Sequence, residues 1–173
     1  LDNYSGVLMT AALYRGLKGY NRNHDFLFIA FDREEEGLLG SKAFVKKSTY
    51  MAKGIHAVIN LECLGLTLPH SWPEGSSDSL EDLFVTVGKR FDTNLNPVSL
   101  KHVRTDSIPF LQSGIPAITL DGIMSYDLFI LDTELDIPSV VDRTTFFQSY
   151  PIILEYILEV DALEEAPDPE NDR

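Results

Sequence analysis

Three short segments of the chain are almost continuously apolar, and they restrict the fold more than any other feature. They read FLFIAF at residues 26–31, IHAVINL at 55–61 and PAITL at 116–120. Short runs rich in β-branched and aromatic residues are typical of strands that are covered on both faces. Segments with the apolar spacing of helices separate them. The sequence therefore predicts the α/β class, with a mixed, largely parallel sheet sandwiched between helices.

The predicted helices have apolar residues that recur every three to four positions. They lie at residues 5–19, 42–47, 78–91 and 146–158, with a shorter one around Phe110. Ser5 is the predicted N-cap of the first helix, since its hydroxyl can accept a hydrogen bond from a backbone amide. A further strand is expected at 98–103. Residues 121–139 mix aspartates, glycine and proline, and they predict a long loop.

Length and charge restrict the class of protein. The chain has 173 residues, which suits one domain, and we expect this domain at residues 1–163, followed by an acidic, disordered tail at 164–173. Acidic residues number 27 against 14 basic ones, a formal net charge of −13 that argues against nucleic acid as a partner. No apolar run is long enough to span a membrane. A single cysteine, Cys63, excludes an internal disulfide and a cysteine-based zinc finger.

Four acidic residues stand where a metal site would form in such a fold. Glu34 and Glu35 follow the first predicted strand, and Glu62 ends the second. Asp2 precedes the first predicted helix. In an open α/β sheet, ligands bind at the carboxyl ends of the strands, where these side chains would meet. Crowded carboxylates raise one another's pKa unless a cation neutralises them, so the sequence predicts a metal site.

Four sequence motifs follow one another along the chain. They are DNYSG at residues 2–6, FDREEEGLLGS at 31–41, AVINLECLG at 57–65 and SGIPAITL at 113–120. Together they resemble successive motifs of the zinc-dependent aminopeptidases, metallopeptidase family twenty-eight. The resemblance implies a zinc-exopeptidase-like fold in which residues 1–163 form the carboxyl-terminal part of a catalytic domain, without its N-terminal strands. We expect the rest of that domain upstream of Leu1.

The resemblance also implies a role for each of the four acids. Asp2 would bridge two zinc ions, with a cis peptide bond to Asn3. Glu35 would bind one ion and Glu62 the other. Glu34 would be the general base, which takes a proton from water and passes it to the leaving amine. The implied reaction is the removal of N-terminal residues, with peptides or amino-acid amides as substrates.

The chain departs from the family at the histidines that complete its metal site. One of these histidines belongs to a motif that would precede Leu1. Asp132 stands in the place of another, within LDTELDIPSVVD at residues 131–142. A further family histidine is replaced by Ser107 or Ile108, depending on the alignment. If Asp132 binds metal, its oxygen ligand shifts the preference from zinc toward manganese, magnesium or calcium.

A second interpretation is that the domain is non-catalytic and serves in binding or assembly. The aspartate in place of a histidine favours this interpretation, whereas the retained Glu34 and Glu35 oppose it. An acidic triplet by itself would only complement the N-terminus of a helix. A fold without its N-terminal strands would expose apolar surface, so self-association is also expected. The sequence assigns no compartment, and a secreted or periplasmic location would follow from the family resemblance only.

Overall fold

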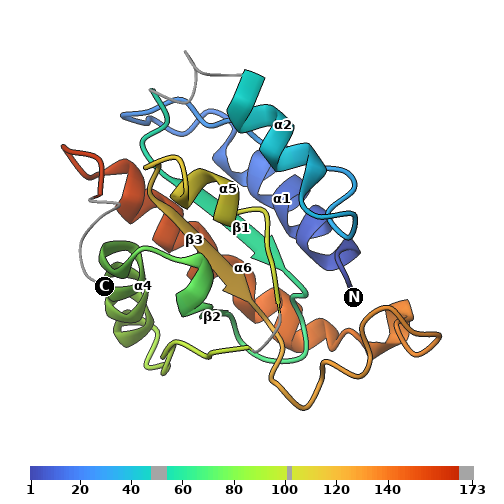
Figure 1. Cartoon of the computed structure of the whole chain (residues 1–173). Coiled ribbons are helices and arrows are strands. Elements are labelled where there is room, and N and C mark those ends of the chain that lie inside the picture. Colours follow the sequence, from blue (N-terminus) through green and yellow to red (C-terminus); the bar gives the residue numbers. More distant parts are fainter. Residues whose placement is uncertain (48–53, 101–102, 168–173) are drawn as a thin grey trace.

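A small mixed sheet lies between helices in the computed structural model, which describes residues 1–47, 54–100 and 103–167 (Figure 1). The strands are β1 (Val58–Glu62), β2 (His70–Ser71) and β3 (Ala117–Asp121). The helices are α1 (Tyr4–Leu17), α2 (Leu39–Lys47), α4 (Asp78–Arg90), α5 (Ile108–Leu111) and α6 (Arg143–Asp161), and the short 3-10 helices are η1 (Pro73–Gly75) and η2 (Pro138–Val140). These elements confirm the α/β class and the helices predicted from apolar spacing.

The sheet has the order β1-β3-β2. β1 and β3 are parallel, with Glu62 of β1 opposite Asp121 of β3, and β2 pairs antiparallel with β3. The predicted mixed sheet is therefore confirmed. Because β1 and β3 run in the same direction, both end at the same edge of the sheet, and the N-terminus of the chain lies beside that edge (Figure 1).

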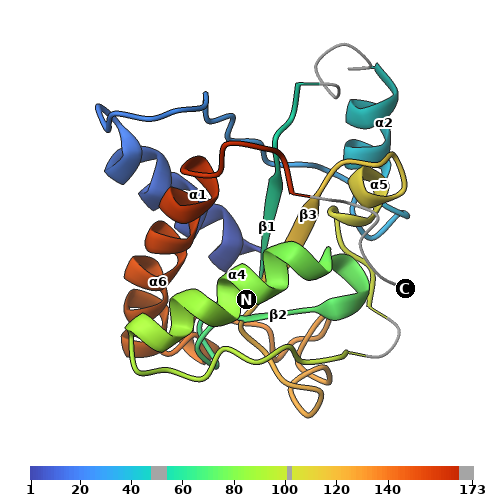
Figure 2. The same cartoon turned by 90° about the vertical axis from the view of Figure 1, so that its left-hand side faces the viewer.

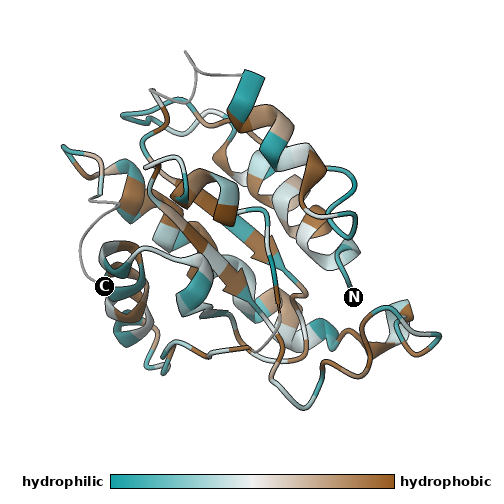
Figure 3. Cartoon of the chain, in the orientation of Figure 1, coloured by the Kyte–Doolittle hydropathy of each residue, from teal (hydrophilic) through white to brown (hydrophobic). Residues whose placement is uncertain are grey.

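Helices cover both faces of the two parallel strands (Figure 2). On one face, Ile118 and Leu120 of β3 pack with α1, α4 and α6 in the largest apolar core. On the other face, Ala117 packs with Phe110 of α5 and with the partly buried Phe44 of α2. Hydrophobic residues accordingly gather along β1 and β3 (Figure 3). Each large apolar side chain buried in this way contributes about 1.5–3 kcal/mol, which fixes the strand ends relative to the helices.

Helix α1 begins two residues earlier than the predicted N-cap implies, because its N-cap is Asn3 rather than Ser5. The Asn3 side chain accepts a hydrogen bond from the Gly6 amide at 3.1 Å. The Ser5 hydroxyl instead donates to the Leu1 carbonyl at 2.9 Å. Asparagine and serine cap helices about equally well, so the local sequence did not distinguish them.

The predicted strand at 26–31 is wrong, because this segment belongs to no ladder among the described residues. Phe28 and Phe31 pack against the apolar cores, whereas the side chain of Leu27 is 60% exposed. An apolar run marks burial, but a strand also requires a neighbouring strand for its backbone groups. Here one side of the segment packs and the other side has no such neighbour in the part of the chain that the structure describes.

The predicted strand at 98–103 is also wrong over its described residues, 98–100 and 103. Among the described residues, the Val98 amide donates a backbone hydrogen bond to the Ser71 carbonyl of β2 at 2.9 Å. Residues 101 and 102 lie outside the described residues. The tail expected at 164–173 stays a prediction, since 168–173 are outside them too. Within the described ranges, no helix combines the length and apolarity needed to cross a membrane.

Candidate metal centre

A cavity of about 430 Å³ lies at the carboxyl ends of β1 and β3. All the residues predicted to form the metal site line it: Asp2, Glu34, Glu35, Glu62 and Asp132. They come from the start of α1, the turn before α2, the end of β1 and the loop after β3. The folded chain thus brings together acids that are up to 130 residues apart in sequence.

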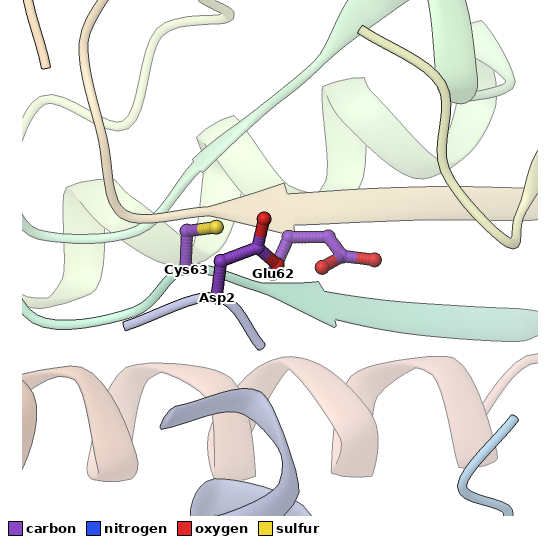
Figure 4. Close-up of side chains that lie close together, drawn as sticks. All are labelled: Asp2, Glu62 and Cys63. Carbon is purple, nitrogen blue, oxygen red and sulfur yellow. The ribbon is translucent and has the colours of Figure 1, made fainter. Parts of the chain in front are cut away.

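The first group of possible ligands is at the end of β1. One carboxylate oxygen of Asp2, one of Glu62 and the sulfur of Cys63 all lie within 4.8 Å of one another. Asp2 lies between the other two side chains (Figure 4). Glu62 and Cys63 are buried, and the Asn60 side chain donates a hydrogen bond to Glu62 at 2.9 Å. We call Asp2, Glu62 and Cys63 the inner group.

The second group of possible ligands is closer to solvent. Carboxylate oxygens of Asp2, Glu35 and Asp132 also lie within 4.8 Å of one another, and the last two residues are exposed. The backbone of Asp132 has a φ of 57°, a left-handed conformation in which aspartate is one of the better tolerated residues. We call these three residues the outer group. Asp2 belongs to both groups, so it stands between two potential cation positions.

Asp2 is held in place by its neighbour Asn3. The Asn3 side chain accepts from the Cys63 amide at 3.2 Å and donates to the Leu61 carbonyl at 2.8 Å, which ties the start of α1 to the end of β1. The Asp2–Asn3 peptide bond is cis, as the family resemblance implied. The Asp2 backbone is also held by Asp136, because the Asp2 amide donates a hydrogen bond to the Asp136 carboxylate at 3.0 Å.

The three glutamates before α2 have different surroundings. Glu34 and Glu35 line the cavity, whereas Glu36 forms an exposed ion pair with Arg33. The chain turns here because the amides of Gly37 and Leu38 donate to the Glu34 carbonyl at 2.9 and 2.7 Å. This turn directs two of the three carboxylates toward the ends of β1 and β3.

Burial and mutual repulsion raise the pKa of several of these carboxyl groups. For Asp2 the largest cause is burial, followed by the charges of Glu35 and Asp132. Burial also raises the pKa of Glu62 well above its ordinary value, against a hydrogen bond from Asn60 that lowers it. Burial raises the pKa of Asp121, the neighbour of Glu62 across the sheet, to about 7. Without a cation, burial and crowding therefore disfavour the ionised form of each of these groups.

Glu34 has the pKa of an acid–base catalyst. Burial raises it to about 7, and the charges of Glu35 and Asp106 add to the effect. A carboxyl group with this pKa both accepts and releases protons near neutral pH. It belongs to neither group of possible ligands, so its carboxylate is free for such a role.

These donors fit divalent metal ions. The outer group offers carboxylate oxygens alone, the ligands that hard cations such as manganese, magnesium and calcium prefer. The inner group adds the sulfur of Cys63, a soft ligand of the kind that zinc accepts. A cation in either position would favour the ionised carboxylates and so offset the burial and the repulsion that raise the pKa values of Asp2 and Glu62.

The sequence did not single out some residues that shape this cavity. Asp121 follows a buried strand in the same way as Glu62, so the rule that selected Glu62 would have selected it as well. Asp136 contacts the backbone of Asp2, but nothing in the local sequence distinguishes it from other loop aspartates. Asp106 accepts a hydrogen bond from the buried Ser41 hydroxyl, and its charge raises the pKa of Glu34. Cys63, which the sequence analysis considered only for disulfides and zinc fingers, belongs to the inner group.

Ser107, one of the two residues that the resemblance offers as the replacement of a family histidine, is fully buried. Its hydroxyl donates to the Gly75 carbonyl at 2.8 Å and contacts the hydroxyls of Thr105 and Thr119 at the same distance. A compact hydroxyl cluster thus occupies this place beside the cavity. His70 is buried in β2 and does not line the cavity.

Solved structures of aminopeptidases share this fold. The zinc aminopeptidase BSAP from Bacillus subtilis matches with a TM-score of 0.76 at 20% identity, over 98% of this chain and 44% of that one. The aminopeptidase from Aneurinibacillus sp. strain AM-1 gives 0.79 at 21% identity, over 99% and 42%. The LapA aminopeptidase of Legionella pneumophila gives 0.81 at 16% identity, over 94% and 48%. The chain thus has the aminopeptidase fold and spans less than half the length of these proteins.

The sequence itself identifies the family. The model of peptidase family M28 matches residues 1–157. The chain therefore belongs to peptidase family M28, a metallopeptidase family, as its motifs indicated. No curated protein matches the chain in sequence.

Proposed function

We propose that the protein is a metal-dependent exopeptidase that removes N-terminal residues from peptides by means of two metal ions. The observation that carries the proposal is the position of Asp2, whose carboxylate belongs to both the inner and the outer group. Glu62 would complete the ligands of one ion, and Glu35 with Asp132 those of the other. Family membership and the aminopeptidase fold support this reading.

Zinc is the proposed metal of the inner group. The similar enzyme from Bacillus subtilis is a zinc aminopeptidase, and Cys63 would add a soft ligand. At the outer group, manganese, magnesium or calcium would compete with zinc because its ligands are all oxygens. When bound, the metal ions would polarise the scissile carbonyl and acidify the attacking water.

Glu34 would transfer the proton in the reaction. Its carboxylate takes a proton from the water that attacks the scissile carbonyl carbon. It then gives this proton to the nitrogen of the leaving amine as the carbon–nitrogen bond breaks, so that one water is consumed and Glu34 is regenerated. A pKa of about 7 suits both steps near neutral pH. The negative charge of Asp106, whose carboxylate accepts a hydrogen bond from Ser41, contributes to this raised pKa.

The replacement Glu34→Gln tests this role. Hydrolysis of leucinamide by the metal-loaded protein should fall about 10²–10⁴-fold, since that is what a positioned acid–base group contributes. Bound metal should stay unchanged. Glu36→Gln is the matched control, because Glu36 belongs to the same acidic cluster but pairs with Arg33 at the surface. Full activity in Glu34→Gln would reject Glu34 as the base.

A non-catalytic binding domain is the alternative, and the replacement of family histidines by Asp132 and by Ser107 or Ile108 favours it. An enzyme of the proposed kind should cleave a peptide with a free N-terminus and leave the N-acetylated peptide intact. A binding domain would take up metal and peptide and release no product. Product analysis by mass spectrometry with both peptides separates these cases.

We also propose that the chain self-associates through the outer face of α1. Val7, Leu8 and Tyr14 are 46%, 48% and 55% exposed on this face, although the opposite face of the helix is already buried in the core. A helix that is apolar on two faces is normally covered on both. Light scattering should give a mass above that of one chain, and Leu8→Lys should lower it. A monomer at all concentrations would contradict this proposal.

A further inference from the structure

A second cavity, of about 630 Å³, adjoins the metal cavity. Leu38, Val103 and Arg104 line both cavities, so a ligand can extend from one into the other past these side chains. Trp72 and Leu100 form part of the apolar wall of the second cavity, and the indole nitrogen of Trp72 is held by a hydrogen bond to the Leu100 carbonyl at 3.2 Å. The wall is therefore built from anchored side chains.

The two cavities differ in charge. In the metal cavity, Arg104 is the one basic residue of the lining among six acids. In the second cavity the basic residues are Arg104 and Lys42, against the single acid Glu74. The Glu74 carboxylate already accepts a hydrogen bond from Ser99. On a chain with a net charge of −13, this is a local reversal of charge next to the proposed reaction site.

Both cations of the second cavity have hydrogen-bonding capacity left. Arg104 is exposed and makes neither a hydrogen bond nor an ion pair with any residue that the structure describes. The Lys42 ammonium uses one donor on the Gly37 carbonyl, at 2.7 Å, and an ammonium has three. A guanidinium presents its donors in a planar fork that matches a carboxylate.

We propose that Arg104, with Lys42, binds a carboxylate of the substrate beyond the scissile bond. The substrate class is then short peptides, whose free amino end and C-terminal carboxylate are close enough to reach both cavities. The acidic metal cavity suits the amino end, and the second cavity suits the carboxylate and an apolar side chain. This inference rests on the proposed peptidase function, and it adds a preference that the metal site alone cannot provide.

The test compares peptides that differ only in the carboxylate. Binding of leucyl-leucine and its C-terminal amide is measured by calorimetry on zinc-loaded Glu34→Gln, in which hydrolysis is blocked. The free acid should bind about tenfold more tightly than the amide, since a charge-assisted hydrogen bond has roughly that effect. Trileucine and its C-terminal amide are compared in the same way. The C-terminal amide of leucyl-glutamic acid has only a side-chain carboxylate, so its affinity shows whether the site binds that carboxylate as well as a terminal one.

Arg104→Gln in the same background should reduce the preference for the acid to less than about twofold, and Lys42→Gln should reduce it in part. Arg15→Gln is the matched control, because Arg15 lies on α1 and lines neither cavity. Equal binding of acids and amides, an undiminished preference in Arg104→Gln, or no binding of any peptide would overturn the inference.

Hydrolysis of leucinamide separates this inference from the proposed function, because leucinamide has no carboxylate. If leucinamide is cleaved and no preference for acids exists, the peptidase function stands and the role of Arg104 falls. If leucinamide is not cleaved but Arg104 governs the binding of peptide acids, the carboxylate site stands and the proposed chemistry falls.

Discussion

The inner and outer groups of acids share Asp2 but are built in different ways. The inner group is attached to the end of a strand: Glu62 belongs to β1, and Asn3 ties Asp2 to the same strand through the Leu61 carbonyl and the Cys63 amide. In the outer group, Glu35 and Asp132 come from loops and are exposed. One potential cation position is thus fixed by the sheet, and the other depends on loops.

This difference in construction should give the two groups different affinities for metal ions and different selectivities among metals. Buried ligands held by hydrogen bonds are already in position, so little conformational freedom is lost when an ion binds. Exposed carboxylates lie in water, which competes for the ion and screens their charge. We therefore expect the inner group to hold its ion more tightly, and the outer group to exchange its ion and to discriminate less between metals.

The largest effect is expected for Asp2→Asn, which changes both groups at once. An amide oxygen is neutral and bridges two cations poorly, so the affinity for each ion should fall by more than about 100-fold, beyond the 10–100-fold typical of residues that only support a ligand. Calorimetric titration with zinc measures both affinities. Asp25→Asn serves as the control, since Asp25 is at the surface beside Arg22. Loss of one ion alone would show that Asp2 is not shared.

The next effect separates the two groups. Glu62→Gln should remove the tighter ion and leave the weaker one, whereas Asp132→Asn should weaken only the second ion, by about tenfold. The smaller value for Asp132 follows from its exposure, because water can replace an exposed ligand. The same titration resolves the two binding steps. Equal losses in the two variants would mean that burial does not set the affinities.

A third replacement tests which metal the outer group prefers. Asp132→His introduces an imidazole, which favours zinc over manganese, and histidine is one of the residues that adopt the left-handed backbone found at this position. The ratio of zinc to manganese affinity at the weaker site should rise about tenfold. Competition dialysis with both metals measures this ratio. An unchanged ratio would indicate that Asp132 does not contact the ion.

The smallest effect concerns pH and stability. The pKa values of Glu34 and Asp121 are raised from 4.5 and 3.8 to about 7, so the folded chain without metal holds protons that the unfolded chain releases in this interval. Its free energy of unfolding should therefore fall as pH rises from about 5 to about 8. Urea unfolding in the presence of chelator measures this slope, and added zinc should flatten it. Stability that increases with pH would contradict the crowding of these acids.

The sequence predicted the parts of the molecule that depend on local patterns. The apolar runs that became β1 and β3 lie in the core, and acids placed directly after predicted strands, such as Glu34 and Glu62, line one cavity. Glu62 reaches the cavity because the parallel strands β1 and β3 end at the same edge, which the alternation of strands and helices already implied. Glu34 reaches it from the turn before α2, since the strand predicted at 26–31 does not form.

Features that depend on distant partners were not predictable in this way. The run at 26–31 has the composition of a strand, but its ladder requires a neighbour that the local sequence does not specify. Asn3 rather than Ser5 caps α1 because Asn3 also contacts Leu61 and Cys63, far along the chain. The sequence did not indicate Arg104 as a binding residue, because its position between two cavities depends on the folded chain.

Counting the metal ions on the unaltered chain tests most directly whether Asp2 serves two cations. The protein is dialysed to equilibrium against zinc and manganese, and the total bound metal per chain is determined by elemental analysis. A sum close to two ions, one of them retained through a further dialysis without metal, is the expected result. A sum of one or none would contradict the shared site.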